Sequence, residues 1–215
     1  MKRVVVTGMG MVTPLGAGVA HNWTRITRGD SGISRITHFD ASELSSQIAG
    51  VVPRGTEAGQ MNADDVVPPK DQKKIDDFIL YAMAAAKEAV GDSGWVAESE
   101  EDRCRTGVMI GSGIGGLSSV EHTAIQLKEK GPRRISPFFI PGSLINLASG
   151  QVSIQYGFKG PNHSVVTACA TGTHAIGDAA RLIMWGDADV MVAGGAESAV
   201  CYLGVTGFSA LRALS

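Results

Sequence analysis

Cys169 is the residue whose type and position are best suited to covalent chemistry. It follows the apolar run 164–168, which predicts a buried strand, and it precedes a segment with helical periodicity. At such a junction, unpaired backbone N–H groups and the helix dipole stabilise both a thiolate and an oxyanion. A cysteine between alanines can also be an inert buried side chain. The junction and the small neighbouring residues favour a nucleophile that accepts an acyl group.

The other thiols and nearby histidines are weaker candidates. Cys104 lies between two arginines but lacks a strand-to-helix turn, and Cys201 is predicted to be structural. His163 stands at the far end of the strand before Cys169, and His174 lies five residues into the following helix, so neither is placed to act as a base. An odd number of cysteines, with no CxxC spacing, indicates reduced thiols and no zinc site.

Alternating strands and helices are predicted to position Cys169. Glycine follows three of the predicted strands directly, and the intervening apolar residues recur at helical spacing. Residues 31–69 are expected to be mostly irregular. Parallel strands joined by helices predict an α/β layered fold with a mostly parallel sheet covered on both faces. The expected strands are 2–7, 106–110, 164–168 and 189–193, and the expected helices are 73–90, 117–130 and one that ends at Gly186.

Composition restricts the class of protein. The 215 residues are 44% hydrophobic and 19% charged, which is typical of a globular domain, and the 28 glycines show no collagen-like period. A net charge of −2 gives no reason to expect nucleic acid or an anionic membrane surface as a partner. No run approaches the roughly 18 apolar residues of a membrane span, and no leader is recognisable. We expect a cytoplasmic protein without membrane insertion.

A nucleotide-binding oxidoreductase is one alternative that the N-terminus suggests. Gly8-Met9-Gly10 resembles the start of a dinucleotide fingerprint, but the third glycine would fall on Thr13, directly before Pro14. The motif is therefore incomplete, and this alternative is disfavoured.

Five segments of the chain carry a family resemblance. They are Val4-Val5-Val6-Thr7-Gly8-Met9-Gly10, Gly111-Ser112-Gly113-Ile114-Gly115-Gly116, Ile135-Ser136-Pro137-Phe138-Phe139, Thr167-Ala168-Cys169, and residues 186–197 from Gly186 to Glu197. Together they resemble the β-ketoacyl-acyl-carrier-protein synthases, condensing enzymes of the thiolase superfamily, and most closely the elongating synthase II type. The resemblance runs throughout the chain and implies a thiolase-like layered fold.

The resemblance also implies a reaction and its partners. Cys169 would take an acyl chain from the phosphopantetheine of acyl-carrier protein and condense it with malonyl-acyl-carrier protein, releasing CO₂, in type II fatty-acid elongation. No cofactor is expected. The resemblance also implies a homodimer that forms through the strand before Cys169. By the same resemblance, the acyl pocket would be lined by Ile114, Phe139, Ala168 and Phe208, and the carrier protein would meet Lys70, Lys73, Lys74 and Arg212.

One departure from the family concerns length. Family members are about twice as long, and their distal half supplies two histidines, a lysine and a phenylalanine loop. Residues 1–215 are therefore expected to form the amino-terminal β-ketoacyl synthase domain, truncated before the carboxy-terminal half, with little of the second half's fold, and to be inactive in condensation alone. A non-catalytic partner of the chain-length-factor kind is the alternative, but such proteins have lost the cysteine.

Overall fold

The computed structural model describes residues 3–214. Its centre is a parallel sheet in the order β6-β5-β7. Two antiparallel strand pairs lie outside it, β1 with β2 and β3 with β4. The strands are β1 (Val12–Thr13), β2 (Gly16–Ala17), β3 (Ile33–Arg35), β4 (Ile48–Gly50), β5 (Thr106–Gly111), β6 (Asn162–His163) and β7 (Val190–Gly195).

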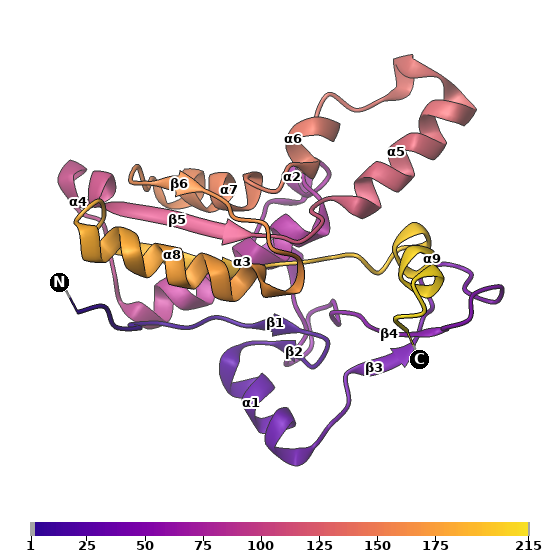
Figure 1. Cartoon of the computed structure of the whole chain (residues 1–215), viewed down its shortest axis with the longest axis horizontal. Helices are drawn as coiled ribbons and strands as arrows, with labels where there is room; N and C mark the ends of the chain where they lie inside the picture. Colours follow the sequence, from indigo (N-terminus) through magenta and orange to yellow (C-terminus); the bar gives the residue numbers. More distant parts are fainter. Residues whose placement is uncertain (1–2, 215) are drawn as a thin grey trace.

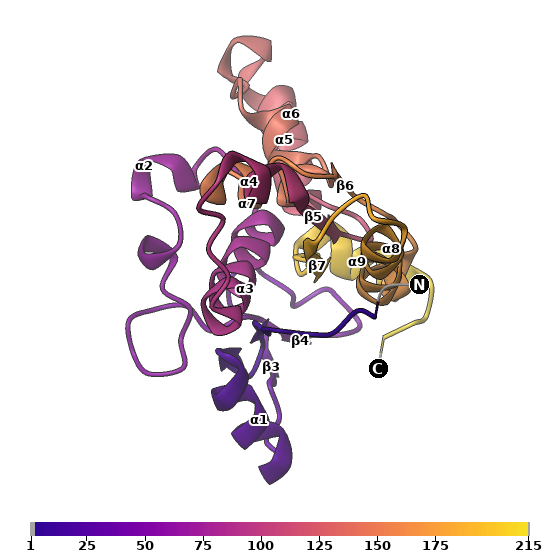
Figure 2. The same cartoon turned by 90° about the vertical axis from the view of Figure 1, so that its left-hand side faces the viewer.

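Helices account for most of the remaining regular structure; some lie against the sheet, and others project away from it (Figures 1 and 2). The α-helices are α1 (Val19–Arg28), α2 (Pro69–Gln72), α3 (Asp77–Ser93), α4 (Glu100–Arg105), α5 (Leu117–Lys130), α6 (Phe139–Ser143), α7 (Leu147–Tyr156), α8 (Thr171–Trp185) and α9 (Tyr202–Ala210). The 3-10 turns are η1 (Ala63–Asp65), η2 (Pro132–Arg134) and η3 (Ala168–Ala170). None of the helices in residues 3–214 is long and apolar enough to cross a membrane.

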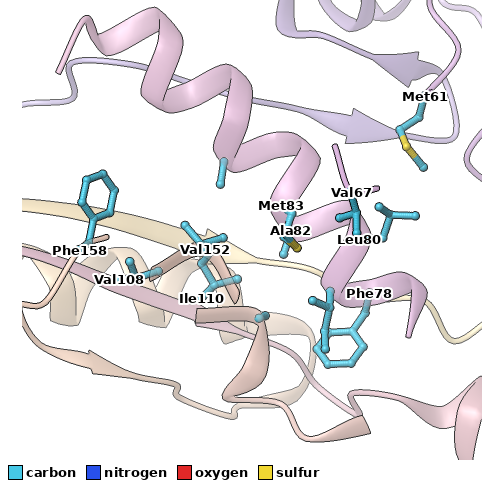
Figure 3. Packing of buried hydrophobic residues seen from close by; sticks show 13 residues of the cluster. Met61, Val67, Phe78, Leu80, Ala82, Met83, Val108, Ile110, Val152 and Phe158 are labelled. Carbon is cyan, nitrogen blue, oxygen red and sulfur yellow. The ribbon is translucent and has the colours of Figure 1, made fainter. Parts of the chain in front are cut away.

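The sheet lies between two helical layers, as the sequence predicted. Figure 2 shows α3 and α7 on one side of β5 and β7, and α8 on the other. Side chains of β5 alternate accordingly, because successive residues of a strand point to opposite faces. Val108 and Ile110 belong to the cluster that includes α3 and α7, whereas Met109 packs with Ala175 and Ala179 of α8. Figure 3 shows the first cluster from close by.

Several predicted elements are confirmed. The helical spacing after residue 73 corresponds to α3, which begins at Asp77, where Asp76 accepts a hydrogen bond from the Phe78 N–H, and ends at left-handed Gly94. Helix α5 spans the predicted 117–130, and α8 ends at left-handed Gly186. Strands β5 and β7 lie where β-branched runs end in glycine. At β5 and β7, short apolar runs closed by glycine therefore marked strands of the central sheet correctly.

The predicted N-terminal strand is wrong for the residues described; its first residue, Lys2, lies outside them. The segment 3–11 is extended but forms no strand ladder, and Val5 and Val6 are 62% and 76% exposed. Two of its N–H groups donate to carboxylates of α3, Met9 to Asp92 at 2.9 Å and Met11 to Glu88 at 2.9 Å. The β-branched run therefore gives an extended backbone, but α3 takes the bonds that a neighbouring strand would take.

The predicted strand 164–168 is also wrong in its position. The ladder to β5 is made by β6 instead and stops after the pair Met109 and His163. Hydroxyl groups occupy the next backbone groups of β5: the Ile110 N–H donates to Ser149 Oγ at 2.7 Å, and Ser164 Oγ donates to the Ile110 carbonyl at 2.6 Å. These side-chain hydrogen bonds end the β5–β6 ladder, and the chain then leaves the sheet and continues to Cys169.

The N-terminus of α8 approaches the sheet more closely than side chains would allow. A Cβ added to Gly195, at the end of β7, would lie 2.8 Å from the Gly172 Cα of α8. A Cβ on Gly111, at the end of β5, would collide with the side chain of Thr171 and the carbonyl of Val165. Glycine is thus required here by contact rather than by backbone conformation.

The close contact between Gly195 and Gly172 predicts how one added methyl group changes the stability of the protein. Gly195→Ala should lower the free energy of unfolding by about 1–3 kcal/mol, because overpacking forces the helix away from the strand. Its neighbour Gly194 is the matched control, since an added Cβ there meets nothing within 4 Å. Urea unfolding of both variants checks this expectation. Equal losses would mean that strand propensity, and not the close approach, sets the cost.

Candidate functional site

Cys169 lies in a tight turn between the end of the extended segment 164–167 and α8. The turn is η3, and the Cys169 side chain is exposed. Ala168, directly before the cysteine, has a φ of 49°, in the left-handed region that non-glycine residues occupy at a cost of roughly 1–2 kcal/mol. The turn therefore leaves Cys169 exposed directly before a long helix.

Helix α8 begins without a side-chain cap. Its N-cap residue is Ala170, which makes no side-chain hydrogen bond, and the first turn contains no acidic residue. The first N–H groups of a helix have no partner within the helix, and they carry the positive end of its dipole. This end of α8 is thus suited to a negative charge that forms beside Cys169.

The other two thiols differ from Cys169 in their surroundings. Cys104 is exposed in α4 and its sulfur lies 4.0 Å from a carboxylate oxygen of Glu100. Cys201 is buried, and this burial raises the pKa of its thiol. Its sulfur accepts a hydrogen bond from the Gly204 N–H at the start of α9, which is a structural role. Cys201 is also at a helix N-terminus, as the N-cap of α9, so Cys169 is the thiol of the three that combines such a position with exposure.

The glycine turn, residues 112–116 after β5, lies against the cysteine turn, which is η3. A Cβ on Gly113 would be 3.4 Å from the Ala168 Cα, so the two turns are in contact. Glu197, which follows β7, holds this glycine turn: it accepts from Ser112 Oγ at 2.9 Å and from the N–H groups of Gly113 and Ile114 at 2.8 and 3.1 Å. One carboxylate thus fixes the loop that faces Cys169.

The predicted acyl-pocket residues lie on elements that converge on this glycine turn. Ile114 is in the turn itself and is 43% exposed. Phe139 begins α6, whose last residue accepts a hydrogen bond at 3.1 Å from the Gly116 N–H. Phe208 is in α9, which packs against α5 directly after the turn. Ala168 supplies the contact with Gly113. The structure therefore brings the four carrying elements together.

The predicted basic residues fall into two places. Lys70 and Lys73, in and directly after α2, are exposed. Lys74 is partly engaged, because its Nζ lies 2.6 Å from an Asp71 carboxylate oxygen and 5.1 Å from the centre of the Phe138 ring. Arg212 follows α9, and Figures 1 and 2 show this end of the chain well apart from α2. The structure does not unite the four in one patch.

Of the two histidines near the cysteine, His174 makes side-chain contacts. His174 Nδ1 lies 3.2 Å from Thr167 Oγ1, and its Nε2 lies 3.1 Å from an Asp178 carboxylate oxygen. His163 is exposed and is the last residue of β6. No group of three or more potential metal ligands occurs within residues 3–214.

Sequence reasoning missed Glu197 and Thr171. Thr171 is 4% exposed, and its hydroxyl bonds to the backbone of Thr167 and Ala168, directly before Cys169. A topological signal was available for Glu197: it follows a glycine-terminated strand parallel to β5, and the carboxyl ends of parallel strands meet at one edge of the sheet. No comparable signal identified Thr171.

Comparison with known proteins gives a consistent result. The family profile described as "Beta-ketoacyl synthase, N-terminal domain" matches residues 1–215. The chain is 58% identical over 216 residues to the 3-oxoacyl-[acyl-carrier-protein] synthase 2 of Rhizobium meliloti (strain 1021), covering 100% of this chain and 51% of that protein. The chain spans about half the length of the curated relatives it matches.

Solved structures agree. The ishigamide ketosynthase/chain length factor is 26% identical with a TM-score of 0.83, covering 98% of this chain and 51% of that one. A type II PKS acyl-carrier protein in complex with its ketosynthase bound to the hexaketide is also 26% identical, with a TM-score of 0.75, covering 97% of this chain and 54% of that one.

The bonds to Glu197 predict how the glycine turn responds to losing a charge. Glu197→Gln should speed hydrogen exchange at the amides of Gly113 and Ile114 roughly tenfold, because an amide side chain cannot accept from all three donors. The Leu203 amide, which donates to Glu121 at 2.9 Å, provides an internal control and should keep its rate. Unchanged exchange at both glycine-turn amides, measured by NMR, would contradict the anchoring role.

Proposed function

The chain belongs to the β-ketoacyl synthase family, as its N-terminal domain, and we propose that Cys169 is the nucleophile that accepts the acyl chain in a decarboxylating condensation. The observation that carries the proposal is the position of Cys169: an exposed thiol, in a strained turn, at the uncapped N-terminus of α8. Relatives named 3-oxoacyl-[acyl-carrier-protein] synthase 2 at 45–58% identity support an enzyme of fatty-acid elongation.

In the first half-reaction, the Cys169 thiolate attacks the carbonyl carbon of an acyl thioester. The carbonyl electrons move to oxygen, where N–H groups at the start of α8 stabilise the charge, and then return as the carbon–sulfur bond to phosphopantetheine breaks. The phosphopantetheine thiolate leaves and takes up a proton. Cys169 then carries the acyl chain as a new thioester.

In the second half-reaction, a malonyl thioester loses CO₂. The electron pair of the broken carbon–carbon bond forms an enolate, whose carbon attacks the Cys169 thioester carbonyl. The Cys169 thiolate departs, and the product is a β-ketoacyl thioester two carbons longer than the acyl chain. This exchange of bonds needs no redox cofactor or metal, and the substrates travel on the phosphopantetheine of a carrier protein.

Acyl-carrier protein is the proposed partner. The similar ketosynthase described above was solved in complex with such a carrier protein. Exposed Lys70 and Lys73 offer positive charge to an acidic partner, while Arg212 would contact it at a second place. The chain-length-factor alternative is less well supported, because this chain retains Cys169 and its close relatives are named as synthases.

A homodimer in the cytoplasm completes the proposal. Strand β6 is at the edge of the sheet, and an open edge readily pairs with a second copy. Apolar side chains on segments near β6 are exposed. They are Ile154 of α7, Val166 in the segment after β6, and Ile176 of α8. Exposed apolar side chains favour burial against another chain. The free cysteines fit a reducing compartment.

The acyl-accepting role predicts a covalent adduct at one thiol. Incubation with an acyl-carrier protein bearing a long acyl chain should increase the mass of the protein by one acyl group, and peptide mapping should find it on Cys169. Cys169→Ser should abolish the adduct, whereas Cys104→Ser, which removes another exposed thiol, should not. An adduct that survives Cys169→Ser would overturn the assignment.

Ile114 is predicted to limit the length of the bound chain. Ile114→Phe should slow acylation of Cys169 by long chains more than by short ones, by about tenfold or more, because a larger side chain in the glycine turn obstructs the pocket. Ile125→Phe, at a 50% exposed position of α5, is the matched control. Equal slowing for every chain length would point to misfolding instead.

A further inference from the structure

The turn that carries Cys169 has a backbone conformation that must be held by its surroundings. Ala168 has a φ of 49°, and such strained residues persist where neighbouring groups over-determine them. A relaxed Ala168 would redirect the next residue, which is Cys169. Whatever holds the backbone of Thr167 and Ala168 therefore sets the direction of the sulfur.

Thr171 holds this backbone from inside the fold. Its hydroxyl accepts a hydrogen bond from the Thr167 N–H at 2.8 Å and donates one to the Ala168 carbonyl at 2.7 Å. A hydroxyl has one donor and two acceptor sites, so a single group can make both bonds at once. The two bonds fall on either side of the strained φ.

The orientation of the Thr171 side chain is itself fixed. Thr171 is 4% exposed, and its methyl group fills the space that Gly111 leaves open at the end of β5. With the methyl group in that space, the hydroxyl is directed at the cysteine turn. The close approach of α8 to the sheet thus determines where the hydroxyl lies.

His174 reaches the same turn from the solvent side but is less constrained. It contacts the Thr167 side chain rather than the backbone, at 3.2 Å, and its own side chain is 39% exposed. A contact open to water contributes less than a buried one, because water can replace it. Thr171 is therefore the principal constraint on the turn.

We propose that Thr171 is the positioning residue for Cys169, and that its hydroxyl directs the sulfur by holding the backbone of Thr167 and Ala168. This inference deepens the proposed function, since it rests on Cys169 as the acyl acceptor. Thr171 touches no reacting atom in this role; it acts through the conformation of the turn.

Two substitutions separate the hydroxyl from the shape of the side chain. Thr171→Val keeps the branched shape and removes the hydroxyl, whereas Thr171→Ser keeps the hydroxyl and removes the methyl group. Thr173→Val is the matched control, because Thr173 is exposed two residues further along α8. The rate constant for alkylation by iodoacetamide is measured at Cys169 and at exposed Cys104 in the same molecule.

The expected result is a loss confined to one thiol and restored by serine. Thr171→Val should lower the Cys169 rate relative to that of Cys104 about tenfold, as expected for loss of a buried hydrogen bond. Thr171→Ser and Thr173→Val should stay within about twofold of the parent protein. Urea unfolding of each variant accompanies the rates, so that a change in stability alone is recognised.

Two outcomes would overturn the proposal: an unchanged rate ratio in Thr171→Val, or an equal loss in the valine and serine variants. Its failure is distinguishable from failure of the proposed function. If Thr171→Val leaves the ratio unchanged while acyl-carrier protein still acylates Cys169, only the positioning role is wrong. If the ratio falls and serine restores it, but Cys169 is never acylated, positioning stands and the acyl-accepting role is wrong.

Discussion

The close backbone approach between α8 and the ends of β5 and β7 is the constraint on which the rest of the site depends. Gly172 and Gly195 lie so close that a single Cβ on Gly195 would come within 2.8 Å of the Gly172 Cα. This approach directs the N-terminus of α8 at the edge where parallel strands end, the usual place for a ligand in an open α/β sheet. It also presses Thr171 against Gly111, so that packing and the conformation of the cysteine turn are determined together.

Two side chains fix the conformations of the two turns that meet at this site, one side chain for each turn. Glu197 bonds to the glycine turn with three hydrogen bonds, and Thr171 bonds to the cysteine turn with two. Both belong to segments that begin or end at the same edge of the sheet. The two loops are therefore held by side chains of neighbouring segments, while Ile114 and Cys169 stay exposed.

Much of the fold was predictable because local signals and tertiary packing agree. Helix α3 carries a cap, an apolar face and a glycine stop, and β5 is a short apolar run closed by glycine. The segment 3–11 shows the limit of such signals. Its valines favour an extended backbone, but a strand also needs a partner, and the described part of the chain offers α3 carboxylates to its N–H groups instead. Propensity alone could not reveal which group would accept those bonds.

The site was predictable to a different extent, for a related reason. Cys169 was proposed as the nucleophile from the sequence because its signal is local: a thiol between an extended segment and a helix. Thr171 was not, because a threonine in a first helical turn is ordinary until its hydroxyl is seen to bond to both Thr167 and Ala168. The basic residues show a similar limit: Lys70 and Lys73 are neighbours at α2, but the resemblance grouped Arg212 with them, and the structure places it well apart, after α9. Residues that perform chemistry are marked by their type, whereas residues that position them are marked by contacts, and contacts between distant segments become visible only in the folded chain.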